Sequence, residues 1–430
     1  MKYRGIFIIA CILLITLFLF ILAKPRFLEI VQAAPLLSLS QSMALLGTVL
    51  FSLSFVLSSR FPFLENLFGG FDKVMKTHQI ISALSVIGLL EHPFLLIFSR
   101  LPNISLILQY IVPSQELPLT LGIFALNSLI GLILVTLFVD LPYHVWKKTH
   151  EFMSVPLIFG ILHTISISSD VSRYMPLKIW IYALLGLGSF AFIYRRYLYK
   201  FIGPRSTYII SQVNRTGDIV ELLMIPKIKP LEIQPGQFVF MSIRSGQMNK
   251  EEHPFSVVKT QEYQSEIRIA AKVVGDYTLL LNQLNRGDEV VLWGPYGTFG
   301  ERFFAPCDVV CIAGGIGITP FISLLEKEAN NPKSNRQIHF FYLVKSNHEA
   351  IYHDKLQFLA YSHTGLHYIL HESQVAGRLS LAHIRQYAGE LMNKRIFLCG
   401  PLPMMRDMTK QLTQSGVKRR SIIYEDFSLK

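Results

Sequence analysis

The first 200 residues contain long stretches without any charged side chain, and these stretches restrict the fold more than any other feature. One of them carries only Glu91, and the others carry no charge at all. A helix needs about 20 mostly apolar residues to cross the hydrocarbon core of a bilayer. We therefore predict a six-helix transmembrane bundle, with helices over residues 5–23, 39–58, 75–98, 117–139, 149–169 and 178–198.

Basic residues flank these helices unevenly. The richer gaps hold Lys2/Arg4, Arg60/Lys73/Lys76, Lys147/Lys148 and Arg195/Arg196/Lys200, and they alternate with poorer ones. Cytoplasmic loops of membrane proteins carry the excess of lysine and arginine. This pattern predicts a multi-pass protein of the cell membrane with both termini in the cytoplasm. The net charge of +12 is then largely a property of the helix ends, and we expect no nucleic-acid partner.

The first apolar stretch also has the charge pattern of a secretory signal peptide. It is longer than the usual apolar region of such a peptide, and no cleavage site of small residues precedes Lys24 and Pro25. We therefore interpret it as a membrane anchor.

Four histidines lie within or at the ends of the apolar helices: His78, His92, His150 and His163. An ionisable residue inside a membrane marks a functional site by default, and haem iron accepts axial histidine. His78 and His92 are 14 residues apart, which places both on one side of a helix and about 21 Å apart along its axis. That spacing suits two haems stacked across the bilayer.

The second pair is less regular. His150 and His163 are 13 residues apart, and 13 steps of an ideal helix end about 140° from the starting face. Pro156 lies between them and predicts a bend. The ligand pairs would be His78 with His150, and His92 with His163. Two alternatives remain open: the histidines are ordinary polar residues near the interface, or His144 replaces His150.

From Gly203 onward the sequence resembles that of a soluble protein. Short alternating runs separated by Gly, Pro, Asn and Asp predict an antiparallel β-barrel over residues 204–302. Buried strands alternating with helical patterns after Asp308 predict an α/β doubly wound domain. The predicted domains are residues 1–200, 201–304 and 305–430. The four cysteines have no spacing typical of zinc and suit a reducing compartment.

Several short motifs in this half are typical of nucleotide sites. Residues 314–320 read Gly-Gly-Ile-Gly-Ile-Thr-Pro between a buried strand and a helix, which is the context for binding a pyrophosphate. The next strand ends at Lys345, with no carboxylate until Glu349. A basic residue at this position accommodates the 2′-phosphate of NADP.

The ordered set of motifs resembles the superfamily of NADPH oxidases and ferric reductases. The set comprises the two histidine pairs, His-Pro-Phe-Ser at 253, Gly-Asp-Tyr-Thr at 275, Gly-Pro-Tyr-Gly at 294, the glycine turn at 314 and Cys-Gly-Pro at 399. The resemblance covers the chain from about residue 40 to the end. Without calcium-binding loops, the chain looks like a compact bacterial-type member.

The resemblance implies roles for individual residues. Flavin contacts would come from His253, Pro254, Phe255 and Ser256, and phosphate contacts from Gly275, Asp276, Tyr277 and Thr278. The nicotinamide nucleotide would contact Gly315, Gly317, Thr319, Pro320, Lys345, Arg378, Gly400 and Pro401, with Cys399 near the nicotinamide. Family members often end in an aromatic residue that covers the flavin; Phe427 is the candidate, although three residues follow it.

The resemblance also implies the function. Electrons would pass from NADPH, with NADH also usable, through FAD and two b haems to oxygen or ferric iron on the outer face. We expect membrane lipid as surroundings and no obligatory protein subunit. Two alternatives stay open: a transporter or channel with a regulatory nucleotide-binding tail, and a b-type cytochrome that serves a periplasmic protein partner.

Overall fold

The computed structural model describes residues 4–113, 115–244, 251–258, 265–332 and 334–425. The chain divides into two compact units. The first comprises residues up to Gly69 together with Lys73–Ile202, and the second comprises Gly70–Asp72 and the chain from Gly203 onward.

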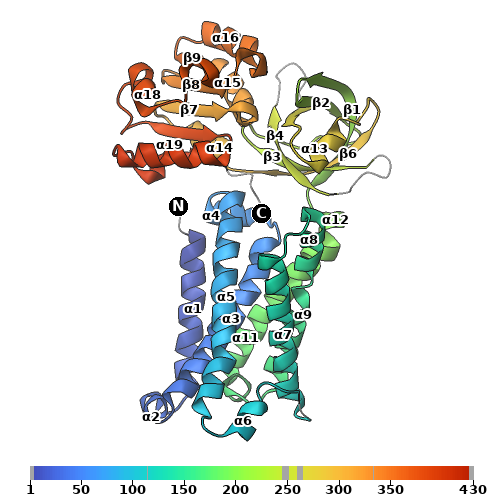
Figure 1. Ribbon diagram of the computed structural model, residues 1–430, viewed down its shortest axis with the longest axis vertical. Helices are drawn as coiled ribbons and strands as arrows, with labels where there is room; N and C mark the ends of the chain where they lie inside the picture. The colour runs from blue at the N-terminus through green and yellow to red at the C-terminus, as the bar shows by residue number, and fades with distance from the viewer. Residues whose placement is uncertain (1–3, 114, 245–250, 259–264, 333, 426–430) are drawn as a thin grey trace. The chain divides into compact units, whose positions relative to one another are not determined.

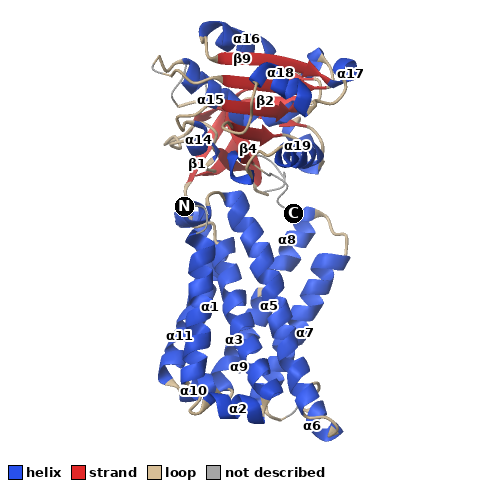
Figure 2. Cartoon of the chain, turned by 90° about the vertical axis from the view of Figure 1, so that its left-hand side faces the viewer, coloured by secondary structure: helices blue, strands red, loops and turns tan. Residues whose placement is uncertain are grey.

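The first unit is helical, and its long helices lie side by side, with α2, α6 and α10 at one end of the bundle (Figures 1 and 2). Large apolar side chains such as Phe7 and Phe138 are 68% and 77% exposed, which suits contact with lipid rather than water. The helices are α1 (Arg4–Leu22), α2 (Phe27–Ala33), α3 (Pro35–Ser58), α4 (Pro62–Phe68), α5 (Phe71–Ser99), α6 (Ile104–Leu108), α7 (Leu117–Phe138), α8 (Tyr143–Glu151), α9 (Ser154–Ser166), α10 (Asp170–Arg173), α11 (Met175–Ile193), a π-helical turn (Tyr194–Leu198) and α12 (Tyr199–Ile202).

Among the described residues, five helices are long and apolar enough to cross a membrane: α1, α3, α5, α7 and the helix from Met175 to Ile202. The predicted count of six is not confirmed, because the fifth predicted helix is broken between Glu151 and Ser154 into α8 and α9. Pro156 is the third residue of α9. It has no N–H to donate to the carbonyl of Phe152, and a proline is most easily accommodated in the first turn of a helix. Where the sequence predicted a bent helix, the structure therefore has two separate helices, α8 and α9.

The second unit begins with the predicted antiparallel barrel. Its strands close in the order β1-β2-β5-β4-β3-β6, around a core that includes Tyr208, Leu222, Ile269 and Leu292. The strands are β1 (Arg205–Thr216), β2 (Ile219–Pro226), β3 (Phe238–Ile243), β4 (His253–Val258), β5 (Ile267–Lys272) and β6 (Glu289–Tyr296), with α13 (Asp276–Leu281) before β6 and α14 (Phe299–Phe303) after it.

The remainder forms a parallel sheet of order β11-β10-β7-β8-β9. One face packs on α15 and α16 and the other on α18 and α19, which is the predicted doubly wound arrangement. The elements are β7 (Val309–Gly314), a 3₁₀ turn (Gly315–Ile318), α15 (Thr319–Ala329), β8 (Ile338–Val344), α16 (His353–Ser362), β9 (Leu366–Glu372), α17 (Ser373–Ala376), α18 (Leu381–Ala388), β10 (Arg395–Cys399), α19 (Leu402–Gln414) and β11 (Ile422–Tyr424).

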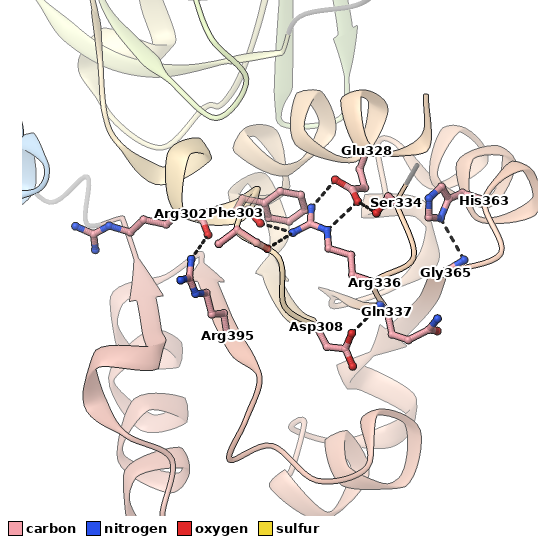
Figure 3. Close-up of polar contacts among 11 residues, drawn as sticks. Arg302, Phe303, Asp308, Glu328, Ser334, Arg336, Gln337, His363, Gly365 and Arg395 are labelled. Atoms are coloured by element: carbon pink, nitrogen blue, oxygen red, sulfur yellow. Dashed lines mark hydrogen bonds and ion pairs between the residues drawn. The ribbon is translucent and has the colours of Figure 1, made fainter. Parts of the chain in front are cut away.

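A buried arginine ties α14 to the start of this sheet (Figure 3). The Arg336 guanidinium donates from Nε to Glu328 Oε1 at 2.7 Å and from Nη2 to the other carboxylate oxygen, and it lies 4.5 Å from the ring centroid of Phe303. Asp308 accepts a hydrogen bond from the Gln337 amide at 2.9 Å. These contacts fix the amino ends of β7 and β8.

Candidate functional site

The four histidines form two pairs in the first unit. His78 on α5 faces His150 on α8, with ring centroids 6.3 Å apart. Bonds between a metal and an imidazole nitrogen are about 2 Å long, so two rings on one metal lie roughly 6 Å apart between centroids. The separation of His78 and His150 therefore fits two axial ligands of one iron.

His92 on α5 and His163 on α9 line a single cavity of about 360 Å³. Its wall is largely apolar and includes Leu89, Leu126 and Leu157. A concave, mostly apolar cavity with a few convergent polar groups is the usual form of a cofactor site.

Three of the four rings are oriented by backbone carbonyls. Nδ1 lies 2.9 Å from the Ser54 carbonyl in His78 and 2.7 Å from the Pro118 carbonyl in His163. In His92, Nδ1 lies 2.9 Å from Ser40 Oγ and 3.2 Å from the Ser40 carbonyl, and the Ser40 hydroxyl donates its hydrogen to the His92 carbonyl at 2.8 Å. These oxygens therefore accept from the rings, so Nδ1 carries the proton and the Nε2 lone pair remains available. Metal-ligating histidines are held in this way.

The fourth ring, His150, is held differently. Its Nδ1 is buried without a hydrogen-bond partner, and the ring stacks on Trp146 at 5.2 Å between centroids. No group of three or more His, Cys, Asp or Glu side chains that could hold a metal occurs among the described residues. Paired histidines thus fit haem, whose porphyrin supplies the other ligands, better than a metal held by protein alone.

A glycine allows the close approach of α7 to His163. A Cβ atom at Gly122 would lie 2.9 Å from His163 Nδ1 and 3.0 Å from Cε1. Sequence reasoning missed Gly122 and the carbonyl partners of the histidines. Nothing distinguishes them in one apolar sequence, because the carbonyl of any residue can accept a hydrogen bond.

The two flavin motifs meet in the barrel. The rings of His253 on β4 and Tyr277 on α13 stack with centroids 3.8 Å apart. Tyr277 donates its hydroxyl hydrogen to the Met241 carbonyl at 2.8 Å, and burial raises the pKa of its phenol. Glu251 Oε2 lies 3.0 Å from His253 Nε2. The pair therefore forms a fixed aromatic surface.

The other residues of these motifs have mainly structural contacts here. Phe255 and Ser256 are buried, and Phe255 belongs to the barrel core. Thr278 Oγ1 accepts hydrogen bonds from the amides of Val274 at 2.9 Å and Gly275 at 3.0 Å. This hydroxyl shapes the turn before α13.

The nucleotide motifs meet where the strand order of the sheet reverses, between β7 and β10. A Cβ at Gly317 would lie 2.4 Å from the Cys399 carbonyl oxygen, and one at Gly400 would lie 3.0 Å from Gly314. Gly315 has a positive φ of 52°, and the space around its position is open. In open α/β sheets, ligands bind at the carboxyl ends of the strands at such a switch point. Thr319 and Pro320 then begin α15.

Cys399 lies at the same edge but is buried, and burial raises the pKa of its thiol. The thiol is therefore protonated at neutral pH and is suited to packing rather than to nucleophilic attack.

The remaining candidate residues for nucleotide binding lie after the carboxyl ends of β8 and β9. Lys345 follows β8, and its carbonyl accepts a hydrogen bond from the Gln374 amide at 3.1 Å. Arg378 follows Gly377, which has a φ of 71°. Glu372, which sequence reasoning missed, ends β9 and accepts a hydrogen bond from the Asn347 amide at 2.8 Å. Phe427 lies outside the described residues.

Three protein families match successive segments of the chain. Residues 43–161 match the family described as ferric reductase like transmembrane component. Residues 206–298 match an FAD-binding domain family, and residues 311–410 match the oxidoreductase NAD-binding domain family. The three segments follow one another in the order of the helical unit, the barrel and the parallel sheet.

Individual relatives resemble the second half of the chain. The reductase component of propane 2-monooxygenase from Mycolicibacterium smegmatis is 29% identical over 230 residues, which is 50% of this chain and 65% of that protein. The electron transfer component of toluate 1,2-dioxygenase from Pseudomonas putida is 26% identical over 231 residues, which is 51% of this chain and 66% of that protein. Each match therefore spans just under two thirds of the relative's length.

One solved structure resembles the chain over most of its length. Flavohemoglobin from Malassezia yamatoensis, determined with bound FAD and heme, superposes with a TM-score of 0.52 at 19% identity, covering 93% of this chain and 98% of that one. At this identity the likeness concerns the fold alone.

Proposed function

Because the chain belongs to the superfamily of ferric reductases and NADPH oxidases, we propose that it carries electrons from NAD(P)H through FAD and two b haems to an acceptor across the membrane. The chain is an FAD-dependent NAD(P)H oxidoreductase with a membrane component. The observation that best supports two haems is the pairing of His78 with His150 and of His92 with His163, with three rings oriented by carbonyls.

The residues of the chain would hold the cofactors and leave the redox chemistry to them. When bound, flavin converts a hydride into single electrons and haem passes them on one at a time. The carbonyls of Ser40, Ser54 and Pro118 keep the proton on Nδ1 of the ligands. The wall of the cavity is largely apolar, so the histidines would be among the few polar groups that meet the cofactor there.

In the second unit, the stacked rings of His253 and Tyr277 would contact the flavin, with Pro254, Phe255, Ser256 and the turn at Gly275 and Asp276 around it. The nucleotide would lie over Gly315 and Gly317, with Cys399, Gly400 and Pro401 beside the nicotinamide. Lys345 and Arg378 would favour NADPH. Phe427 remains the candidate that covers the flavin.

The acceptor on the far side would be oxygen or ferric iron, with both termini in the cytoplasm of the cell. Membership of an oxidoreductase superfamily argues against a transporter or channel. A b-type cytochrome that serves a periplasmic partner protein would be recognised by the absence of steady turnover with oxygen or ferric chelate alone.

The decisive experiment removes one ligand from the purified full-length protein. His92→Ala should lose about half of the haem, measured as haem per protein by the pyridine haemochrome spectrum, while reduction of the flavin by NADPH persists. His144→Ala, which removes a histidine outside the pairs, is the matched control and should keep all haem. Full haem content and full turnover in His92→Ala would refute the assignment.

A further inference from the structure

A buried lysine follows α1 and precedes α2, and α2 and α10 lie at one end of the helical bundle (Figure 2). Lys24 follows α1, and only 7% of its side chain is exposed. Its Nζ lies 2.8 Å from Asp170 Oδ2 and 2.8 Å from Gln41 Oε1, and 4.9 Å from the ring centroid of Phe20. One cation thus joins the turn after α1 to the starts of α3 and α10.

The partners of Lys24 belong to the cavity of the second histidine pair. Gln41, Phe20 and Asp170 line the same cavity as His92 and His163. The carboxylate of Asp170 is therefore a fixed negative charge in the cavity wall, and the ammonium group of Lys24 lies directly behind it. Electrostatic interactions in such a poorly solvated place are screened much less than those at the surface.

The match to the ferric reductase family does not include the residues of this arrangement. Lys24, Gln41 and Asp170 all lie outside residues 43–161, the segment that matches the ferric reductase family. A buried ion pair contributes little to stability by itself, because both charges lose their hydration. Its position beside a redox site suggests another role.

We propose that Lys24 and Asp170 are positioning residues that set the electrostatic potential, and thereby the reduction potential, at the haem held by His92 and His163. This inference rests on the proposed two-haem function. Reduction of ferric to ferrous iron adds one electron. A carboxylate that has lost its ammonium partner disfavours that step, whereas an ammonium that has lost its carboxylate favours it.

The test is a redox titration of the haem spectra in the purified full-length protein. Lys24→Gln should lower the midpoint potential of one haem and Asp170→Asn should raise it. The double variant should return it near the wild-type value. If the unpaired charge and the iron are taken to be roughly 15 Å apart in a medium of effective dielectric about 20, the ratio of ferrous to ferric haem changes about sixfold. A sixfold change is about 46 mV for a one-electron couple.

Arg173→Gln is the matched control, because it removes an exposed cation from the same short helix. Its charge is screened by water, so the potential should stay unchanged. A shift of both single variants in the same direction, or no shift at full haem content, overturns the proposal. If Lys24→Gln fails to accumulate, the test uses the other two variants: the midpoint potential should rise in Asp170→Asn and return near the wild-type value in the double variant. A wild-type protein without a second haem would instead refute the proposed function.

Discussion

The contact between Gly122 and His163 leads to a quantitative prediction for Gly122→Ala. The added methyl carbon would lie 2.9 Å from Nδ1 and 3.0 Å from Cε1 of the imidazole, against an ordinary contact of about 3.5–4.0 Å between such atoms. The ring must therefore retreat by roughly 0.5–1 Å, and its hydrogen bond to the Pro118 carbonyl, 2.7 Å long, is stretched and weakened. Loss of such an outer contact typically weakens metal affinity by about 10–100-fold.

The assay is haem retention. Purified Gly122→Ala is incubated with excess apomyoglobin as haem acceptor, and the loss of haem is followed by its absorption. One of the two haems should leave about 10–100 times faster than in the wild type. Gly131→Ala on the same helix is the control, since the space around its Cβ is empty and alanine favours a helix over glycine. Equal rates in the two variants would refute the reasoning.

Three further predictions concern the second unit. Gly317→Ala places a methyl group 2.4 Å from a backbone carbonyl of β10 and should lower the melting temperature and abolish NADPH oxidation. Gly315→Ala meets no protein atom, but its φ of 52° strains an alanine, so it should lower the melting temperature less than Gly317→Ala and raise the Michaelis constant. Arg378→Ala should raise the Michaelis constant for NADPH about tenfold, the value of one charge-assisted hydrogen bond, and leave that for NADH nearly unchanged; equal effects on both would remove Arg378 from the site. Burial lowers the pKa of His339 to about 4, so the folded protein favours the neutral ring, and the stability present above pH 6.5 is lost as the pH falls toward 4. Denaturant titrations should therefore show that the free energy of unfolding of His339→Phe depends less on pH over that range than that of the wild type. An equal pH dependence in both proteins would contradict this.

The sequence predicted the helices well because an uncharged apolar run has few alternatives to crossing a membrane. The predicted helix over residues 117–139 differs from α7 by one residue at its end. The predicted helix over residues 39–58 begins four residues late, since Pro35 opens α3 and proline at a first turn resembles a loop residue in sequence. The two sheet types were also predicted, because short alternating runs favour an antiparallel barrel and buried strands that alternate with helices favour a parallel sheet.

The contacts that orient the histidines could not be predicted from the sequence. Ser40 and Ser54 lie 52 and 24 residues from the rings they contact. Ser54 acts through its backbone carbonyl, which carries no residue-specific pattern, and Ser40 acts through its carbonyl and its hydroxyl. Lys24 and Asp170 were visible only as isolated charges near helix ends. The sequence did not identify Glu372, because Glu372 lies near the end of β8 only through the pairing of β8 with β9, in which Val344 and Glu372 are opposite each other.

The unequal spacing of the two histidine pairs follows from the break between α8 and α9. On an unbroken helix, residues 13 apart point about 140° away from each other, and both could not face α5. The chain leaves the helix after Glu151 and resumes it at Ser154, so the two segments take their orientations separately. His150 then meets His78, and His163 lines the cavity of His92. Pro156 suits the break, because it lacks the N–H that a continuous helix would use at that position and lies in the first turn of α9. The break between α8 and α9 thus allows both pairs to form.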